Sequence, residues 1–326
     1  MSTTLERTIF GATEHDLVGV VQEESPTEAT LGDLFWFTLP ALKITPATLA
    51  DAYRQAGISE KLLPPPIEAH DAFRRATSRL ALESSPVSLL IRPGGHDKER
   101  IIRYVTAEIQ HEIQHEKKLR YSAAATFIFN RRDNTASAHI TDFLPPEAQV
   151  LVDAAVEKFP GEFADCQRYL ESEHVRMSIY KIMDTEHIIR ARPSGGVYFA
   201  LQAHNTAMRQ IETLLGTLKP LAPNADFYSL TVRDAAKDLA MVTNATTNHV
   251  RVEANSLLRD MGNLLDRAAA GHKIRQQTAE GFLEEAKRLT QLLEEYRNKT
   301  RDQFSDAASD LDLVRRQVIA LMNVAE

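Results

Sequence analysis

The spacing of hydrophobic and polar residues changes along this chain, and each spacing predicts a different kind of element. An aromatic-rich run from Leu34 to Leu39 predicts a strand that Pro40 ends, after a shorter candidate strand at 17–21. Between Val87 and Ile140 apolar and polar residues alternate, which is typical of half-buried strands. An antiparallel meander is expected there, with strands at 87–91, 100–113, 118–129 and 137–140 and turns at 93–95 and 133–134.

Two helices are predicted before the meander. Thr45 and Pro46 are a good N-cap and first-turn proline, and Gly57 lies where the helix that they begin would end. A second helix is expected over residues 68–82. These elements predict an α+β N-terminal domain with an antiparallel sheet over residues 1–143.

The middle of the chain, residues 144–233, has the element order of a winged-helix unit. Two short apolar runs flank residues 193–196, Pro-Ser-Gly-Gly, and predict a β-hairpin closed by a glycine turn. Three short helices are expected before this hairpin, at 147–158, 162–170 and 173–183. A helix at 206–218 and a short strand at 227–232 are expected after it.

The region 234–326 has the spacing of packed helices, because its apolar residues alternate steps of three and four. Gly271 and His272 predict a reversal, and one helix would then run from Lys273 to the end with a slip near Arg301. We therefore expect a long helical hairpin or coiled coil. Its apolar seam can be buried within one chain or between two copies, and the pattern leaves both open.

Composition narrows the classes of partner and the compartment. The formal net charge is −7, so any nucleic-acid binding has to come from a local basic patch. Cys166 is the single cysteine, which excludes an internal disulfide and disfavours a cysteine-rich zinc site. The sequence shows no signal-peptide pattern and no run of about eighteen apolar residues, so we expect a cytoplasmic protein without a membrane span.

Residues 111–115, His-Glu-Ile-Gln-His, form an HExxH string, which on a helix brings two imidazoles to one zinc ion. The alternation around the string predicts a strand, on which His111 and His115 lie roughly 13 Å apart. No third ligand is signalled downstream. A zinc-dependent hydrolase using His111, Glu112 and His115 therefore stays an alternative, and otherwise we expect no metal and no cofactor.

Other chemical motifs point to packing rather than catalysis. Cys166 lies in a predicted helix with no neighbouring base, as a packed thiol does. Ser194 lacks the GxSxG turn of hydrolases. The glycine pairs at 94–95 and 195–196 lack the spacing of phosphate-binding loops.

Basic residues in the middle region are candidates for nucleic-acid contact. In a winged helix the third helix enters the major groove and the wing contacts the backbone. The candidates on the third predicted helix and the wing are Arg176, Lys181, Arg190 and Arg192. Acidic neighbours such as Glu173 and Glu186 count against nucleic-acid contact and favour protein docking. Two further basic groups, which solvated surfaces also explain, are Lys117, Lys118, Arg120, Arg131 and Arg132 on the meander and Arg74, Arg75 and Arg79 on the second helix.

Three strings resemble the recurrent blocks of an uncharacterised family of bacterial and phage or integrative-element proteins. They are LGDLFWF at 31–37, IEAHDAFRRAT at 67–77 and RPSGGVYF at 192–199. The resemblance runs over roughly the first two-thirds of the chain and brings no catalytic residue with it. It implies a mobile-element or phage-related context.

Taken together, these patterns predict a non-catalytic adaptor with a DNA-associated role as one form. Self-association through 234–326 is the expected contact, and DNA or a host or mobile-element protein are the other candidate partners. The alternatives are the zinc-dependent hydrolase and a purely structural self-assembling protein.

Overall fold

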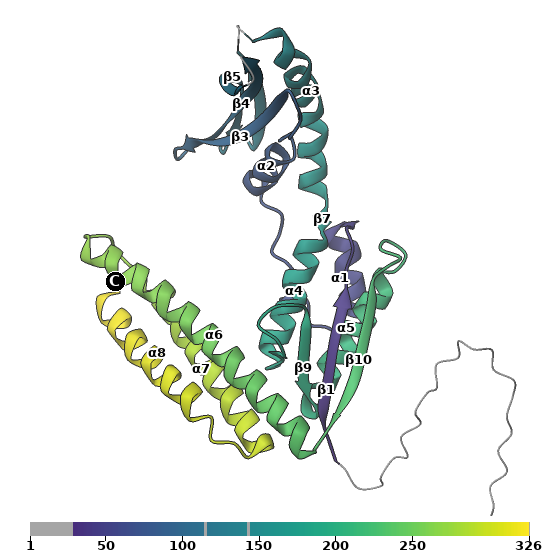
Figure 1. The fold of residues 1–326 in the computed structure, drawn as a ribbon, viewed down its shortest axis with the longest axis vertical. Coiled ribbons are helices and arrows are strands. Elements are labelled where there is room, and N and C mark those ends of the chain that lie inside the picture. The colour runs from purple at the N-terminus through teal and green to yellow at the C-terminus, as the bar shows by residue number, and fades with distance from the viewer. Residues whose placement is uncertain (1–28, 114–115, 142–143, 326) are drawn as a thin grey trace, which may run out of the picture.

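The computed structural model describes residues 29–113, 116–141 and 144–325, so the candidate strand at 17–21 lies outside it. Figure 1 shows a central sheet with helices beside it, a second sheet with its own helices at the top, and a group of long helices at the left. The expected mixture of helices and antiparallel sheets is confirmed.

The central sheet is built around the aromatic-rich strand. Its strands are β1 (Thr30–Thr38), β8 (Ile189–Arg190), β9 (Val197–Leu201) and β10 (Asp226–Arg233), in the spatial order β10-β1-β9-β8. All neighbours are antiparallel, and β1 is hydrogen bonded on both edges. The aromatic strand, the hairpin and the strand near 227–232 are therefore confirmed as predicted.

One face of this sheet packs on three helices, α1 (Pro46–Gln55), α4 (Ser172–Thr185) and α5 (Asn205–Leu218). Phe35, Tyr53 and Ile179 are fully buried in this core because an amphipathic stripe of each element turns inward. The predicted ends of α1 are confirmed. The Thr45 side chain accepts the Thr48 N–H at 3.2 Å, and Gly57 follows the helix with a φ of +69°.

A smaller unit is inserted into the chain between α1 and α4. Its elements are α2 (Ala69–Ser78), β3 (Val87–His96), β4 (Arg100–Ile113), β5 (Glu116–Asn130), β6 (Thr135–Ile140) and α3 (Pro146–Arg168). The four strands form the predicted antiparallel meander, and α2 and α3 pack on one face of it. Short elements beside it and near the sheet are β2 (Lys43–Ile44), β7 (Leu170–Glu171), η1 (Glu60–Leu62) and η2 (Gln202–His204).

The first predicted turn of the meander is wrong. Pro93 and Gly95 lie inside β3, where they shift the register, and the chain reverses at Asp97 instead. The Asp97 carboxylate accepts the N–H groups of Glu99 and Arg100 at 2.8 and 2.6 Å, which stabilises the reversal there. The turn at 133–134 is confirmed, with Asn134 at a φ of +56°.

The winged-helix arrangement is not confirmed. The two helices expected at 147–158 and 162–170 are one helix, α3, with Pro160 inside it. The helix continues because its apolar face does: Val152, Phe159 and Cys166 are all buried against the meander. The loss of one backbone hydrogen bond at Pro160 costs less than exposing that face. The hairpin pairs with β1, whereas α3 packs on α2 and the meander of the inserted unit, so the helices and the hairpin do not form one winged-helix unit.

The C-terminal region forms three helices rather than a two-helix hairpin, and a coiled coil is not confirmed. They are α6 (Ala236–Ala269), α7 (Gln276–Thr300) and α8 (Ser305–Val324). The reversal at Gly271 is confirmed, but the expected slip near Arg301 is a second chain reversal, with left-handed backbone at Arg301 and Phe304. The seam is buried within the chain, against Phe199, Leu201 and Val232 of the central sheet. No helix in the described ranges is both long and apolar enough to cross a membrane.

Gly32 sets the closest approach between β1 and β9, at a shift in the β1 register. A Cβ there would lie 2.1 Å from the Ala200 carbonyl oxygen and 2.9 Å from Leu201 Cα. We expect Gly32→Ala to lower the free energy of unfolding by about 1–3 kcal/mol, measured by urea denaturation. Gly216→Ala in α5, where a Cβ meets nothing within 4 Å, is the control and should be neutral or stabilising. Equal losses in both variants would contradict this account of the β1–β9 contact.

His249 of α6 is buried against β8, and its Nδ1 accepts the Arg190 N–H at 3.4 Å. Burial, helped by the charges of Arg288 and Arg190, lowers the pKa of His249 to about 4. In the unfolded chain the ordinary histidine pKa is about 6.5. The free energy of unfolding is therefore not reduced by His249 above about pH 6.5, where the side chain is neutral in both states. It falls by up to about 3 kcal/mol as the pH falls towards 4, because the unfolded chain takes up a proton that the buried His249 does not.

His249→Asn keeps an acceptor for the Arg190 N–H but does not titrate. We expect the stability of this variant, measured by urea unfolding at a series of pH values, to fall less steeply than that of the parent between pH 6.5 and 4. Parallel curves in this window would show that His249 is not the titrating group.

Candidate metal centre

Three side chains from distant parts of the chain meet where α7 packs on the central sheet. They are His187, which follows α4, His204 of η2, and Glu295 of α7. One ligand atom from each lies within 4.8 Å of the other two. All three side chains are partly buried, with 18, 15 and 28% of their surfaces exposed. Water and small ions therefore reach the group, while the surrounding protein fixes it.

His187 is held in a strained backbone conformation. Its φ of +51° is left-handed, and it occupies the position after the α4 C-cap that glycine usually fills. The Ile188 N–H donates to the Met183 carbonyl at 2.9 Å, which closes the helix end around it. A non-glycine residue in this conformation costs of order 1 kcal/mol, and such costs cluster at functional sites. The position aims the imidazole at α7 instead of at solvent.

His204 faces a carboxylate on each side of its ring. Its Nε2 lies 2.6 Å from Glu295 Oε1, and its Nδ1 lies 3.5 Å from Glu186 Oε2. If Nε2 binds a cation, Nδ1 keeps the proton and presents it to Glu186. That carboxylate–histidine–metal arrangement is the one that orients most metal-bound histidines.

Glu295 links the two imidazoles. Its Oε2 lies 2.8 Å from His187 Nδ1 and its Oε1 lies 2.6 Å from His204 Nε2. Burial raises the pKa of the Glu295 carboxyl, but the hydrogen bonds from the two histidines outweigh burial, so its pKa lies below the ordinary value. The carboxylate is thus ionised and available as an anionic ligand.

The next residue of α7, Tyr296, fixes the helix against the same loop. Its ring is completely buried edge-on to Phe199, and its hydroxyl lies 3.1 Å from the His187 carbonyl oxygen and 3.3 Å from that of Phe199. The hydroxyl donates to these carbonyls, so the backbone that carries His187 cannot move away from α7 without breaking a buried hydrogen bond.

Two imidazole nitrogens and one carboxylate are the ligand set of many zinc and first-row transition-metal sites. Metal bonds of about 2.0–2.2 Å require ligand atoms roughly 3–3.5 Å apart. The two hydrogen-bonded pairs, at 2.8 and 2.6 Å, are closer than this, and the three ligand atoms lie within 4.8 Å of one another, so side-chain rotations would bring them to the metal spacing as the ion replaces the two N–H protons. The donor set therefore fits a divalent transition metal.

Two of the four residues predicted to contact nucleic acid donate hydrogen bonds to backbone carbonyls. Arg176 donates to the Leu39 carbonyl at 2.8 Å, and Lys181 donates to the Lys61 carbonyl at 3.3 Å. The Arg190 guanidinium lies 6.0 Å from the centre of the Tyr180 ring, and Arg192 is exposed in the hairpin turn. Arg176 and Lys181 thus hold the segments before α1 and α2 on α4.

The HExxH residues lie partly outside the described ranges. His111 and Glu112 are strand residues of β4, opposite Lys118 and Lys117 of β5, while His115 is not described. The backbone at His111 is therefore extended, as the alternation predicted, and not the helix that this zinc motif requires. The arginines of α2 are ion-paired: Arg79 with Glu162 and Glu171, Arg75 with Glu171, and Arg74 with Asp71.

The sequence did not predict this candidate metal centre, because His204 and His187 lie 91 and 108 residues from Glu295 and the three share no motif spacing. One signal was present. His187 and His204 flank the two ends of the predicted hairpin, and antiparallel strands bring those ends together. Nothing in the heptad pattern distinguishes Glu295 from the other acidic residues of α7.

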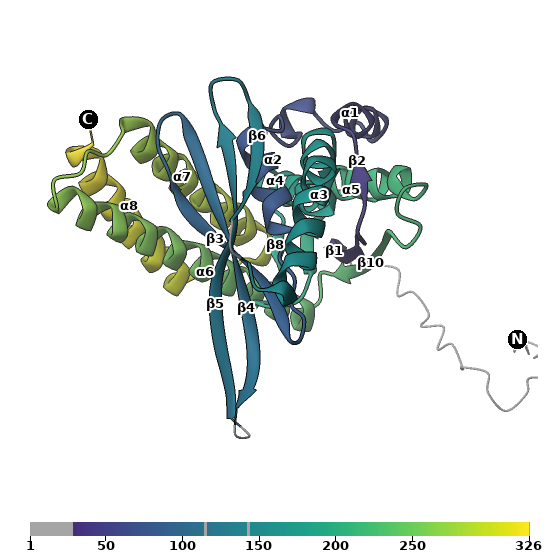
Figure 2. The same ribbon diagram turned by 90° about the horizontal axis from the view of Figure 1, so that it is seen from above.

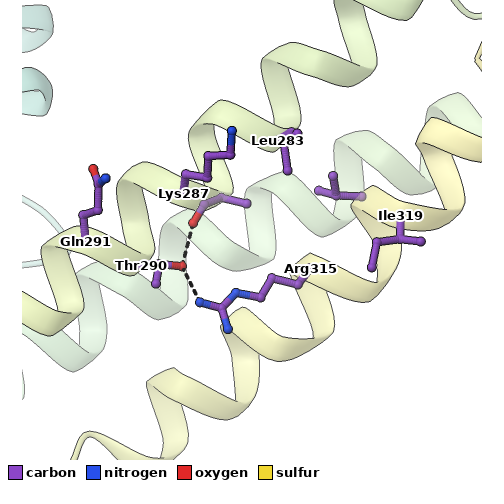
Figure 3. Close-up of a pocket in the computed structure, with 8 residues that line it drawn as sticks. Leu283, Lys287, Thr290, Gln291, Arg315 and Ile319 are labelled. Carbon is purple, nitrogen blue, oxygen red and sulfur yellow. Dashed lines mark hydrogen bonds between the residues drawn. The ribbon is translucent and has the colours of Figure 1, made fainter.

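Two cavities lie away from this centre. A groove of about 430 Å³ runs between α7 and α8, with Leu283 and Ile319 at its rim (Figure 3). In it the Thr290 hydroxyl donates to the Ala286 carbonyl and accepts from Arg315 at 3.1 Å, so these polar groups already have partners. A second cavity of about 550 Å³ lies between residues 62–65 and α4, beside Met177 and His174.

Comparison with known proteins gives a family but no activity. No curated protein and no solved structure matches the chain. The family of unknown function DUF6744 matches residues 30–326, which covers every described element. The expectation of an uncharacterised family is confirmed, and the chain belongs to the DUF6744 family.

Proposed function

We propose that this protein is a metal-binding, non-catalytic adaptor that holds one divalent transition-metal ion, zinc first among them, at His187, His204 and Glu295. The observation that carries the proposal is the convergence of these three ligand atoms, from three segments, at one partly buried point. The left-handed backbone at His187 supports it, because a residue that costs stability there is expected to serve the site.

The ion would have a structural role, which is to join two parts of the fold. His187 and His204 flank the hairpin of the central sheet, and Glu295 belongs to the C-terminal helices. A metal bond to each would fasten the two parts together, and ion binding would add directly to the stability of that contact. The groove of Figure 3 and the cavity beside α4 are lined by other residues, which favours a structural ion over one that activates a substrate.

The wider role that we propose is that of a mobile-element or phage-related adaptor. Its support is the resemblance of the blocks at 31–37, 67–77 and 192–199. Self-association through the C-terminal helices is part of this proposal. Exposed Ile319, at the rim of the groove between α7 and α8, is the side chain that a second copy would bury.

Zinc titration of the purified, chelator-treated chain tests the metal proposal. We expect uptake of one equivalent per chain, measured by calorimetry and metal analysis, and a rise in the unfolding temperature with zinc. Glu295→Gln and His204→Gln should abolish stoichiometric uptake because each removes a ligand. His139→Gln, an exposed histidine of β6, is the matched control and should bind like the parent.

His187→Gly separates loss of the ligand from loss of the fold. Glycine relieves the left-handed strain while the hydrogen bond to Glu295 is lost, so we expect the metal-free stability to stay within about 1 kcal/mol of the parent. Zinc uptake should nevertheless disappear. Uptake that survives in all three ligand variants but is lost in His111→Gln would refute the proposed centre and favour the hydrolase string.

Light scattering of the full chain tests self-association. We expect a dimer or larger species that Ile319→Glu converts to the monomer, because burying a new charge at the contact is costly. Val252→Glu changes another exposed apolar side chain, on α6, and should leave the assembly intact. A monomeric parent at micromolar concentration would remove self-association from the proposal.

A further inference from the structure

The inserted sheet has one covered face and one open face. On the covered side Phe127 and Phe129 are buried under α2 and α3. On the other side Tyr104 of β4 and Tyr121 of β5 are 46 and 57% exposed. Figure 2 shows β4 and β5 extending as a ribbon beyond the helices. Large apolar and aromatic side chains at the surface of a strand pair are a mark of binding surfaces.

The exposed Tyr104 ring is held in place against the sheet. A Cβ on Gly94 would lie 2.9 Å from the Tyr104 ring, so the ring rests directly on the backbone of β3. Arg92 stands directly opposite Tyr104 in the register and is exposed. A flat ring held on the sheet with a guanidinium beside it offers one stacking surface and one cation for a planar anionic ligand.

A second exposed ring, that of Tyr121, lies farther along the same face of the sheet. It pairs with Glu108, four residues beyond Tyr104 on β4, which places the two tyrosines roughly 13 Å apart along the strands. The Tyr121 hydroxyl donates to the Glu108 carboxylate, so the ring is also held in place. Leu119, 52% exposed, continues the same face towards the ribbon tip.

The charge of this unit is opposite to that of the chain. Residues 87–140 contain nine Lys and Arg against six Asp and Glu, while the whole chain has a net charge of −7. Exposed Lys118 and Arg120 lie near the ribbon tip, and Arg132 lies at the β5–β6 turn. Arg92 lies on the open face, while the alternation of side chains directs Lys118 and Arg120 to the other side of the two-stranded ribbon. The inserted unit as a whole is thus locally basic and attracts a polyanion despite the acidic chain.

We infer that the open face of the β3–β6 sheet binds single-stranded nucleic acid, with bases stacked on Tyr104 and Tyr121 and phosphates near Arg92. A basic patch alone would fit any polyanion. Two exposed rings fixed on neighbouring strands favour a ligand with accessible base faces, which duplexes lack. This inference does not rest on the metal centre.

Fluorescence anisotropy with a labelled oligodeoxythymidylate and the full chain tests the proposal. The key variant is Tyr104→Thr with Tyr121→Thr, since threonine retains strand propensity without a ring. Stacking is worth about 1–3 kcal/mol per base, so we expect this double variant to bind about tenfold more weakly or worse. The dependence of affinity on salt should be unchanged, while Arg92→Gln should reduce it.

Tyr228→Thr is the matched control, because Tyr228 is also 46% exposed but lies on the central sheet. It should bind like the parent, and circular dichroism should show all variants folded. The proposal is overturned if the double variant binds as tightly as the control, if the parent does not bind, or if duplex DNA or heparin binds as tightly as the oligonucleotide. An equal affinity for heparin would point to an acidic protein partner instead.

The same assay also tests whether nucleic acid binds at α4 and the hairpin instead. The variant for this test replaces four residues by alanine: Arg176, Lys181, Arg190 and Arg192. If the inserted sheet is the binding face, this fourfold variant retains oligonucleotide affinity once its folding is verified. A loss confined to the fourfold variant would move nucleic-acid contact to α4 and the hairpin and would overturn the sheet proposal.

Discussion

The pairing of β1 with a neighbour on each edge is the constraint on which the rest of this structure depends. β1 lies between β9 and β10 and contributes side chains to a hydrophobic core on each side of the central sheet. Phe35 enters the core formed with α1, α4 and α5, whereas Leu31 packs with the C-terminal helices. Two hydrophobic cores thus share one strand, and hydrophobic burial on each side stabilises the other through the sheet.

The candidate metal centre follows from that two-sided burial. The hairpin brings His187 and His204 to one edge of the sheet, and α7 reaches the same edge because its apolar stripe packs on Phe199 and Leu201. Glu295 and Tyr296 are neighbours on that helix, one for the imidazoles and one for the backbone carbonyls. Polar contacts at a partly buried junction of this kind are specific in geometry, because an unpaired group there is costly.

Local signals in the sequence predicted the local structure well. The caps of α1, the alternation of the meander and the glycine turn of the hairpin each depend on a few adjacent residues. Predictions that needed distant contacts were less successful. Pro160 was expected to separate two helices, but α3 continues through it because Phe159 and Cys166 are buried on the same face. The heptad steps could not show that the chain turns again at Arg301, and the metal ligands meet only in three dimensions.

The joint between the inserted unit and the central sheet is formed largely by charges. The ends of the unit are closed by the short β2–β7 pair, and Lys43 reaches Asp165 of α3 at 2.6 Å. Arg75 and Arg79 of α2 both approach Glu171 of β7. Ion pairs at exposed positions weaken as the Debye length shortens. Salt therefore weakens the exposed Lys43–Asp165 pair, while each part on either side of the joint keeps its own apolar interior.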